Sequence, residues 1–345
     1  MSGFTTTLKE SSILFAGLAA MLLCTTVCQG AWSQYSRDLR KIAATYGLAP
    51  PFASGRNIIL SSSFTKMVFE EDARKMSFNG VIVWMNGAVS RSDNRWLLMD
   101  QDLKNVVHPL LRPDSAVAGE GSRTVVLDPG HGGKDQGTAG ARGTMEKRVV
   151  LDVAKRVARK LQDSQVIVRM TRSTDTYLSL AERCRKAGSL GADVFVSIHA
   201  NSAADRSVSG IESFVMTSQG CAGTNTRRPD PRAYSGNGHD PANMLLGYYV
   251  QKGLLSCSEA QDRGVKRARF EVLRDIGSPA VLVECGFLSN SREESKLNDP
   301  RYRDAVANGI ARGILTYLSR ARSAKVDLDR AARQARVTAR SQAAD

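Results

Sequence analysis

The chain has 345 residues, of which 42% are apolar and 24% are charged, and its formal net charge is +14. The length predicts two domains, and the ordinary balance of apolar and charged residues excludes disorder throughout. No run reaches the about 18 apolar residues of a convincing membrane span. The positive charge alone is compatible with nucleic acid. No nucleic-acid-binding motif accompanies it, however, so we expect no nucleic acid and instead an anionic glycan or envelope surface.

Residues 1–30 are predicted to be a secretory signal peptide. An apolar run from Ile13 to Cys24 follows Lys9, and no charge lies between Glu10 and Arg37. The run is too short to span a membrane and suits the apolar core of a signal, with cleavage before Ala31. An uncleaved anchor is the alternative, and only in that case do we expect membrane attachment. Both alternatives place the catalytic part in an extracytoplasmic space; with the signal cleaved we expect a secreted protein and favour the periplasm.

Four cysteines remain once the signal is removed: Cys184, Cys221, Cys257 and Cys285. In an oxidising compartment they allow three sets of disulfides. Cys221 and Cys257 flank one polar insertion and form the pair that we favour. Cys285 ends an apolar strand, where a cysteine also packs as a small hydrophobic residue. The sequence has no CxxC motif, so it does not support a thiolate zinc site.

Residues 36–113 are predicted to form a small α+β module with antiparallel strands. Short apolar runs alternate with turns, and Asn79-Gly80 and Asn86-Gly87 are typical hairpin turns. The module contains one histidine, His108, and no metal-ligand cluster. Residues 114–122 are small and polar and are interpreted as a linker.

Residues 123–319 change pattern, because apolar strands now alternate with helical spacing. Continuous apolar strands are expected at 124–127, 193–199 and 280–283, with helices between and after them. This alternation predicts an α/β domain with a mostly parallel sheet flanked by helices on both faces. Residues 320–345 form a basic tail, which we interpret as a solvated helix or a disordered segment, or as a contact for an anionic polymer.

Two of the four histidines directly follow predicted strands, where open α/β sheets bind ligands. His131 lies in a glycine-rich turn and His199 ends the strand 193–199. Glu146 begins the helix between these strands, a position that a favourable interaction with the helix dipole also explains. Together the three residues form a set of two histidines and one carboxylate, which is typical of catalytic zinc with one position left open for water.

Glu284 follows the apolar strand 280–283, where a buried carboxylate is costly unless it is paired or functional. If this strand lies beside the one that ends at His199, Glu284 reaches the open metal position. A carboxylate there can act as the acid and base of an amide hydrolysis. The alternative is a structural glutamate held in a salt bridge.

A series of motifs in fixed order runs through the segment 123–319. They are Asp128-Pro-Gly-His-Gly-Gly133, Asp135 with Gly137, Glu146-Lys147, Thr171-Arg172, Asp175, Leu180, Arg183, 192–201, 210–212, 264–266 and 281–290. In these motifs the segment resembles the zinc-dependent N-acetylmuramoyl-L-alanine amidases of the amidase type 3 class. The resemblance implies zinc ligands at His131, Glu146 and His199, with Glu284 as catalytic acid and base. It also implies cleavage of the amide between N-acetylmuramic acid and L-alanine in peptidoglycan. Other zinc amide hydrolases of the wall, or a non-catalytic wall-binding protein, are the alternatives.

The resemblance extends to finer expectations. Asn201 and Lys266 are expected to contact substrate or to orient ligands, and Asp175 is expected to pair with Arg183. The insertion 218–240 is interpreted as a surface loop, a lid or a loop that binds an activator protein at the rim of the active site. Its His239 is a weaker candidate for a metal contact in a blocked state.

Residues 36–113 resemble a module named after the N-terminal domain of copper amine oxidases. The resemblance implies no copper here, because the ligand cluster is missing, and implies a role in positioning the enzyme on the wall. It rests on Leu60-Ser-Ser62, Phe69, Asp72, Arg74, Asn79-Gly80, Val83-Trp84 and 109–113.

Overall fold

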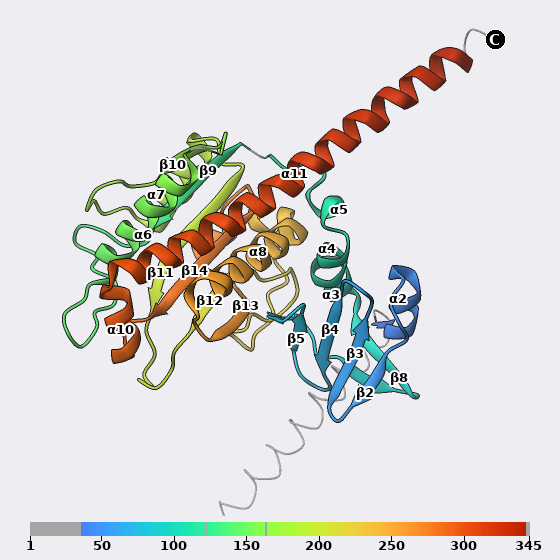
Figure 1. Ribbon diagram of the computed structural model, residues 1–345, viewed down its shortest axis with the longest axis horizontal. Coiled ribbons are helices and arrows are strands. Elements are labelled where there is room, and N and C mark those ends of the chain that lie inside the picture. The colour runs from blue at the N-terminus through green and yellow to red at the C-terminus, as the bar shows by residue number, and fades with distance from the viewer. Residues whose placement is uncertain (1–35, 122, 163, 343–345) are drawn as a thin grey trace, which may run out of the picture.

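The computed structural model describes residues 36–121, 123–162 and 164–342 (Figure 1). The predicted signal peptide, residues 1–30, lies outside the described residues. Among the described helices, none combines the length and the apolar character needed to cross a bilayer.

Six strands form the sheet of the catalytic domain, in the order β10-β9-β11-β14-β12-β13. Neighbouring strands run parallel except β12, which is antiparallel to β14. The predicted α/β class is therefore confirmed, with β12 and β13 running opposite to the other four strands. The strands are β9 (Thr124–Pro129), β10 (Ile167–Met170), β11 (Val194–Asn201), β12 (Ile211–Met216), β13 (Asp262–Ala268) and β14 (Ala280–Phe287).

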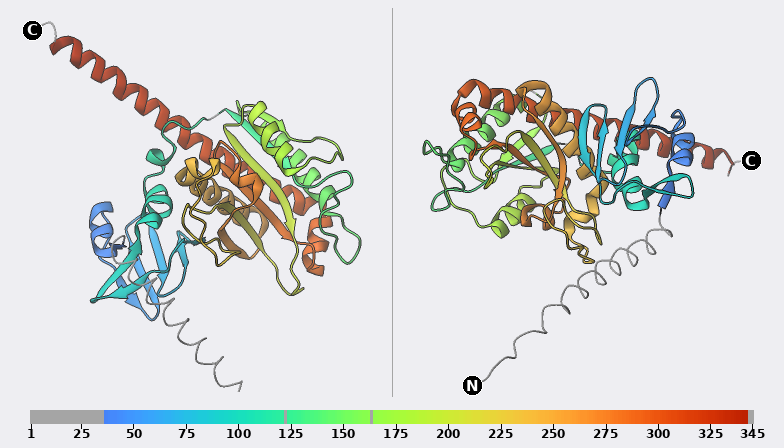
Figure 2. Two further views of the ribbon diagram at one scale, coloured as in Figure 1. Left: turned by 180° about the vertical axis from the view of Figure 1, so that it is seen from behind. Right: turned by 90° about the horizontal axis from the view of Figure 1, so that it is seen from below.

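Helices cover both faces of this sheet, as predicted (Figures 1 and 2). On one face, apolar residues of α6 (Glu146–Leu161), α8 (Asp240–Ser258) and α11 (Pro300–Gln342) pack against alternate strand residues such as Val125 and Val196. On the other face, α7 (Leu180–Ser189) and α9 (Glu271–Arg274) pack against Val126 and Phe195. Because both faces are buried, the central strands have continuous apolar sequences.

The N-terminal module extends the catalytic sheet. Its antiparallel strands follow in the order β6-β5-β4-β3-β2, and β6 pairs with β13 through Val83 and Val265, which makes one sheet of eleven strands. A second small sheet, β1-β8-β7, and helix α2 (Leu39–Tyr46) complete the module. Its strands are β1 (Ser36–Asp38), β2 (Phe52–Ser54), β3 (Asn57–Ser61), β4 (Lys66–Glu70), β5 (Lys75–Phe78), β6 (Val81–Trp84), β7 (Ser90–Ser92) and β8 (Arg95–Met99).

The two expected hairpin turns of the module have different outcomes. Asn79 and Gly80 have φ angles of 47° and 87° and join β5 to β6, which pair from Phe78 and Val81 onward. This is the two-residue hairpin that the sequence predicts. Asn86-Gly87 follows β6 but makes no hairpin, because β6 and β7 belong to different sheets. The backbone amides of Asn86 and Gly87 instead donate to the buried carboxylate of Asp102.

The segment expected to be a linker is partly helical and packed. Helix α5 (Pro113–Val117) begins with proline at its first position, where the missing amide costs nothing. Val117 is fully buried and belongs to the core that α8 and α11 share. The connection between module and catalytic domain is therefore part of the packed structure. Two further short helices, α3 (Asp100–Asp102) and α4 (His108–Leu111), flank a π-helical turn at Leu103–Val107.

The described part of the basic tail, residues 320–342, continues the last helix without a break. Helix α11 runs to Gln342 and extends beyond the body of the molecule (Figures 1 and 2). Its first part packs into the core, with Ala321 and Ala324 still buried. Of the two conformations expected for the tail, the structure shows the helix. Helix α10 (Ser291–Asn298) precedes α11.

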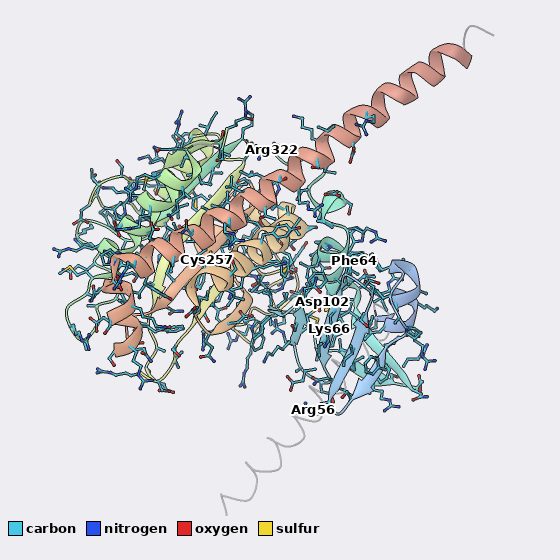
Figure 3. All side chains as sticks on the ribbon, viewed as in Figure 1. Arg56, Phe64, Lys66, Asp102, Cys257 and Arg322 are labelled. Carbon is cyan, nitrogen blue, oxygen red and sulfur yellow. The ribbon has the colours of Figure 1, made fainter. Side chains whose placement is uncertain are left out.

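The favoured Cys221–Cys257 disulfide is wrong, because all four described cysteines are free. Cys221 is buried near Asp240 at the start of α8, whereas Cys257 lies near the end of that helix. At about 1.5 Å per residue, the helix separates them by roughly 25 Å, far beyond the about 7 Å limit between the α-carbons of a disulfide. Cys257 instead lies beside Arg312 of α11 (Figure 3).

Candidate metal centre

The predicted site residues converge at the carboxyl edge of neighbouring strands. His131 follows β9, and His199 lies near the end of the adjacent β11. In the next strand, β14, Glu284 is paired in register with His199. The prediction that the strands ending at His199 and Glu284 lie side by side is confirmed.

His131, Glu146 and His199 lie within metal-binding distance of one another, and one ligand atom from each falls within 4.8 Å of the others. Glu146 Oε1 is 3.1 Å from His131 Nε2 and 3.0 Å from His199 Nδ1. The two imidazole rings are edge to face, with centroids 5.0 Å apart. Although burial opposes it, hydrogen bonding to both histidines holds the pKa of Glu146 far below its usual value. An ionised carboxylate between two imidazoles is a ligand set suited to zinc.

Two glycines lie so close to this cluster that neither has room for a side chain. A Cβ atom on Gly130 would lie 2.2 Å from the His199 ring, and one on Gly137 would lie 2.5 Å from Glu146 Oε2. His131 itself has a φ of 58°, a left-handed conformation uncommon for a residue other than glycine. The glycine-rich loop thus lets backbone approach the ligands closely while it aims the His131 ring at Glu146.

Two buried arginines bind backbone carbonyl oxygens of this loop. Arg183 donates to the carbonyl oxygen of His131 at 2.6 Å and forms a salt bridge with the fully buried Asp128 at 2.8 Å. Arg172 donates to the carbonyl oxygen of Gly130 at 2.6 Å. The expected pair of Asp175 with Arg183 is therefore wrong. Asp175 instead pairs with Lys147 at 2.8 Å. The two expected partners are separated because the Asp175 side chain is exposed to solvent, whereas the Arg183 side chain is buried.

Asp135 orients the first histidine. Its Oδ2 lies 2.8 Å from His131 Nδ1, which leaves Nε2 directed at Glu146. Burial lowers the pKa of His131, but Glu146 and Asp135 together raise it above its usual value. A carboxylate behind a ligating histidine commonly fixes its tautomer and ring orientation. The sequence motif contains Asp135, but its role becomes visible only from this contact.

Glu284 is 9% exposed, and its Oε2 atom has no hydrogen-bond partner among the described residues. Burial, followed by the like charges of Glu146 and Glu212, raises the pKa of Glu284 well above its usual value, and Lys266 acts in the opposite direction. A buried carboxylate oxygen without a partner normally costs free energy. Glu284 is in register with His199 on the adjacent strand and interacts with the charge of Glu146, so the carboxylate lies beside the ligand set.

Glu212 is the residue whose role sequence reasoning missed. Asn201 Nδ2 donates to its Oε1 at 2.8 Å, and Arg263 Nε and Lys266 Nζ both donate to its Oε2. Asn201 and Lys266, expected at the substrate, are thus both bonded to this buried carboxylate. The signals in the sequence were the motif 210–212, to which no role was attached, and an acidic residue within a mostly apolar strand.

The insertion 218–240 is not at the rim of this site, contrary to expectation. Because β12 runs antiparallel to β14, Glu212 lies at the site. Met216, at the other end of β12, lies toward the amino end of β14, away from the site. The insertion begins there and is anchored: Arg74 of the module donates to the carbonyl oxygens of Ala222 and Gly223. His239 is hydrogen-bonded to Glu120 at 3.0 Å, so it is not beside the metal cluster.

The profile of the family described as N-acetylmuramoyl-L-alanine amidase matches residues 125–316, more than half of the chain. The chain belongs to this family. The match confirms the sequence interpretation of the catalytic domain as a peptidoglycan amidase of the type 3 class.

Relatives support the same assignment. The amidase AmiA of Escherichia coli is 32% identical over 57% of this chain and 76% of its own length. The amidase LytC of Bacillus subtilis is 39% identical over 56% of this chain, but the match covers only 35% of LytC. A solved N-acetylmuramoyl-L-alanine amidase from Clostridium difficile 630 is 36% identical over 57% of this chain and 97% of its own, with a TM-score of 0.50. These matches cover the catalytic domain of a chain that has more than one part.

Proposed function

We propose that the protein is a zinc-dependent amidase that cleaves peptidoglycan between N-acetylmuramic acid and L-alanine. His131, Glu146 and His199 would hold the metal. Two nitrogen ligands and one carboxylate suit zinc and leave a coordination position open. The observation that carries the proposal is Glu284 Oε2, a buried oxygen without a partner next to this ligand set.

When bound, zinc supplies a Lewis acid that lowers the pKa of a water ligand and polarises the scissile carbonyl. Glu284 accepts the proton of the attacking water. It then returns that proton to the alanine nitrogen as the C–N bond breaks, which releases a lactyl carboxylate and a free amine. Burial and the like charges of Glu146 and Glu212 raise the pKa of Glu284, which favours its role as the acid that returns the proton. Asp135 keeps His131 in the ligating orientation throughout.

The N-terminal module would position this chemistry on the wall, and the secretion pattern of residues 1–30 supports export, with the periplasm as destination. An activator protein that binds the insertion 218–240 would have to act from the edge of the sheet opposite the metal site. A polymeric substrate would require an open groove at this site rather than a deep pocket.

The test is a mass-spectrometric digest of purified peptidoglycan with the wild type, with and without a chelator, and with Glu284→Gln as a matched inactive variant. We expect stem peptides that begin at free L-alanine and glycan chains that keep intact lactyl groups, only without chelator. Cleavage of another amide would instead assign a peptidase or deacetylase. No cleavage by a chain that binds zinc stoichiometrically would contradict the proposed activity and favour a wall-binding protein.

A further inference from the structure

Four charged side chains meet beside the metal ligands. Glu212 and Glu284 lie directly opposite each other in the β12–β14 pair. Lys266 and Arg263 come from β13, on the other side of β12, and both bind Glu212 Oε2. The cluster thus has two acids and two bases, yet both bases bind the same acid. Glu284 is left without a partner on Oε2.

We propose that Glu212 is a positioning residue that captures Lys266 and so keeps this lysine from forming an ion pair with Glu284. The inference rests on the proposed function, in which Glu284 needs a free carboxylate oxygen. A lysine bound to Glu284 would occupy that oxygen, so the carboxylate could no longer take up and return the proton there.

The geometry makes Lys266 the base that matters. Arg263 has further contacts, because its guanidinium lies over the Phe287 ring at 4.9 Å and donates to the Ser209 carbonyl oxygen at 3.4 Å. Apart from Glu212, the Lys266 ammonium lies over the Phe214 ring at 5.7 Å, and its charge acts on Glu284. Its side chain is 16% exposed and that of Glu212 is 3% exposed, so the ion pair is poorly screened. Without Glu212, the Lys266 ammonium still has Glu284 of β14 within reach of its charge, across the intervening strand β12.

Glu212→Gln is a suitable variant because it keeps the shape and the oxygen that accepts from Asn201, but presents an amide to Lys266. We expect kcat on a soluble muropeptide to fall by roughly ten- to hundredfold with KM changed by less than about threefold. Zinc content and far-UV circular dichroism should match the wild type. Glu212→Asp keeps the charge and should lose less activity, which also provides a milder variant should Glu212→Gln fold poorly.

The decisive measurement is a double variant. If the released Lys266 causes the loss, kcat of Glu212→Gln/Lys266→Met should be at least about tenfold higher than kcat of Glu212→Gln, since removal of the lysine frees Glu284 again. The matched control is Glu212→Gln/Lys296→Met, because Lys296 lies on α10 over the Tyr302 ring, away from this cluster. The control should recover nothing. A Lys266 double variant no better than Glu212→Gln would overturn the inference.

A crystal structure of metal-free Glu212→Gln gives a readout that does not depend on activity. We expect Lys266 Nζ within hydrogen-bond distance of Glu284 Oε2, and a lysine that keeps its wild-type place would contradict the inference. Failure of the proposed function is distinguishable, because it would appear as an inactive wild type with zinc bound. Failure of the inference leaves the wild type active and the double variant unrescued.

Discussion

Glu212 lies directly opposite Glu284 across the antiparallel pair of β12 and β14, and both side chains are buried. Two carboxylates in facing positions repel each other. In this fold the repulsion is offset on one side only, by Arg263 and Lys266 at Glu212. Glu212 is therefore paired with two cations, whereas the pKa of Glu284 is raised. Two similar residues acquire different roles in this way.

Replacement of Glu284 by Gln should abolish turnover without loss of zinc. The amide keeps the size of the side chain but cannot accept a proton. We therefore expect the rate at which stem peptides are released from peptidoglycan to fall by at least about a hundredfold. Zinc per chain, measured by inductively coupled plasma mass spectrometry, should stay unchanged. Glu259→Gln, at an exposed position after α8, is the control and should keep full activity. A fully active Glu284→Gln would remove the residue from the mechanism.

Replacement of His131 or His199 by Ala should remove the metal itself. Each substitution leaves two ligands, which is too few for tight zinc binding. We expect purified variants to hold well under one zinc per chain after gel filtration. His239→Gln is the matched control, because His239 contacts Glu120 at a different place, and it should keep its zinc. A histidine variant that retains stoichiometric zinc would take that residue out of the ligand set.

Replacement of Asp135 by Asn should weaken zinc binding without abolishing it. The carboxylate holds His131 Nδ1 at 2.8 Å, and loss of such a partner typically costs about 10- to 100-fold in metal affinity. Competition with a chromophoric chelator measures the change. Asp205→Asn, in the loop after β11, serves as control because Asp205 bonds only within its own turn. Equal affinities for Asp135→Asn and the wild type would show that the contact does not orient the ligand.

The four described cysteines should react as free thiols in the mature protein. Alkylation in denaturant without reductant should add four labels to a chain that lacks residues 1–30, because Cys221 and Cys257 lie at opposite ends of α8. A reductant should leave the melting temperature unchanged. A chain that takes up only two labels would demonstrate a disulfide and contradict the structure.

The metal ligands were predictable because each follows a pattern that sequence displays. His131 and His199 directly follow apolar strands, and parallel strands bring such positions to one edge. Glu212 was not assigned a role, and the insertion 218–240 was placed at the wrong edge, for one reason. The apolar pattern of β12 does not encode its direction, and an expected parallel strand proved antiparallel.

The sequence also did not reveal how the module docks on the catalytic domain. Alternation in β6 indicates which side chains face the core, with Val81 and Val83 buried, but not which strand lies at its edge. The pairing with β13 depends on contacts between distant residues, such as Ile82, whose amide donates to Asp262 at 2.8 Å. The favoured disulfide failed similarly, because the spacing of two cysteines in sequence does not reveal a helix between them.

The continuous sheet predicts that module and catalytic domain unfold together. Trp84 Nε1 donates to the carbonyl oxygen of Arg263 at 3.1 Å across their boundary. Trp84→Phe keeps an aromatic ring but removes this bond, at a cost of about 1 kcal/mol. Calorimetry should show one transition in the wild type, shifted down as a whole by roughly 2–4 °C in the variant. Trp96→Phe is the matched control, since Trp96 Nε1 is buried without a partner and its loss removes no hydrogen bond. Two separate transitions, with only one moved by Trp84→Phe, would show that the module is attached to the sheet but does not share its stability.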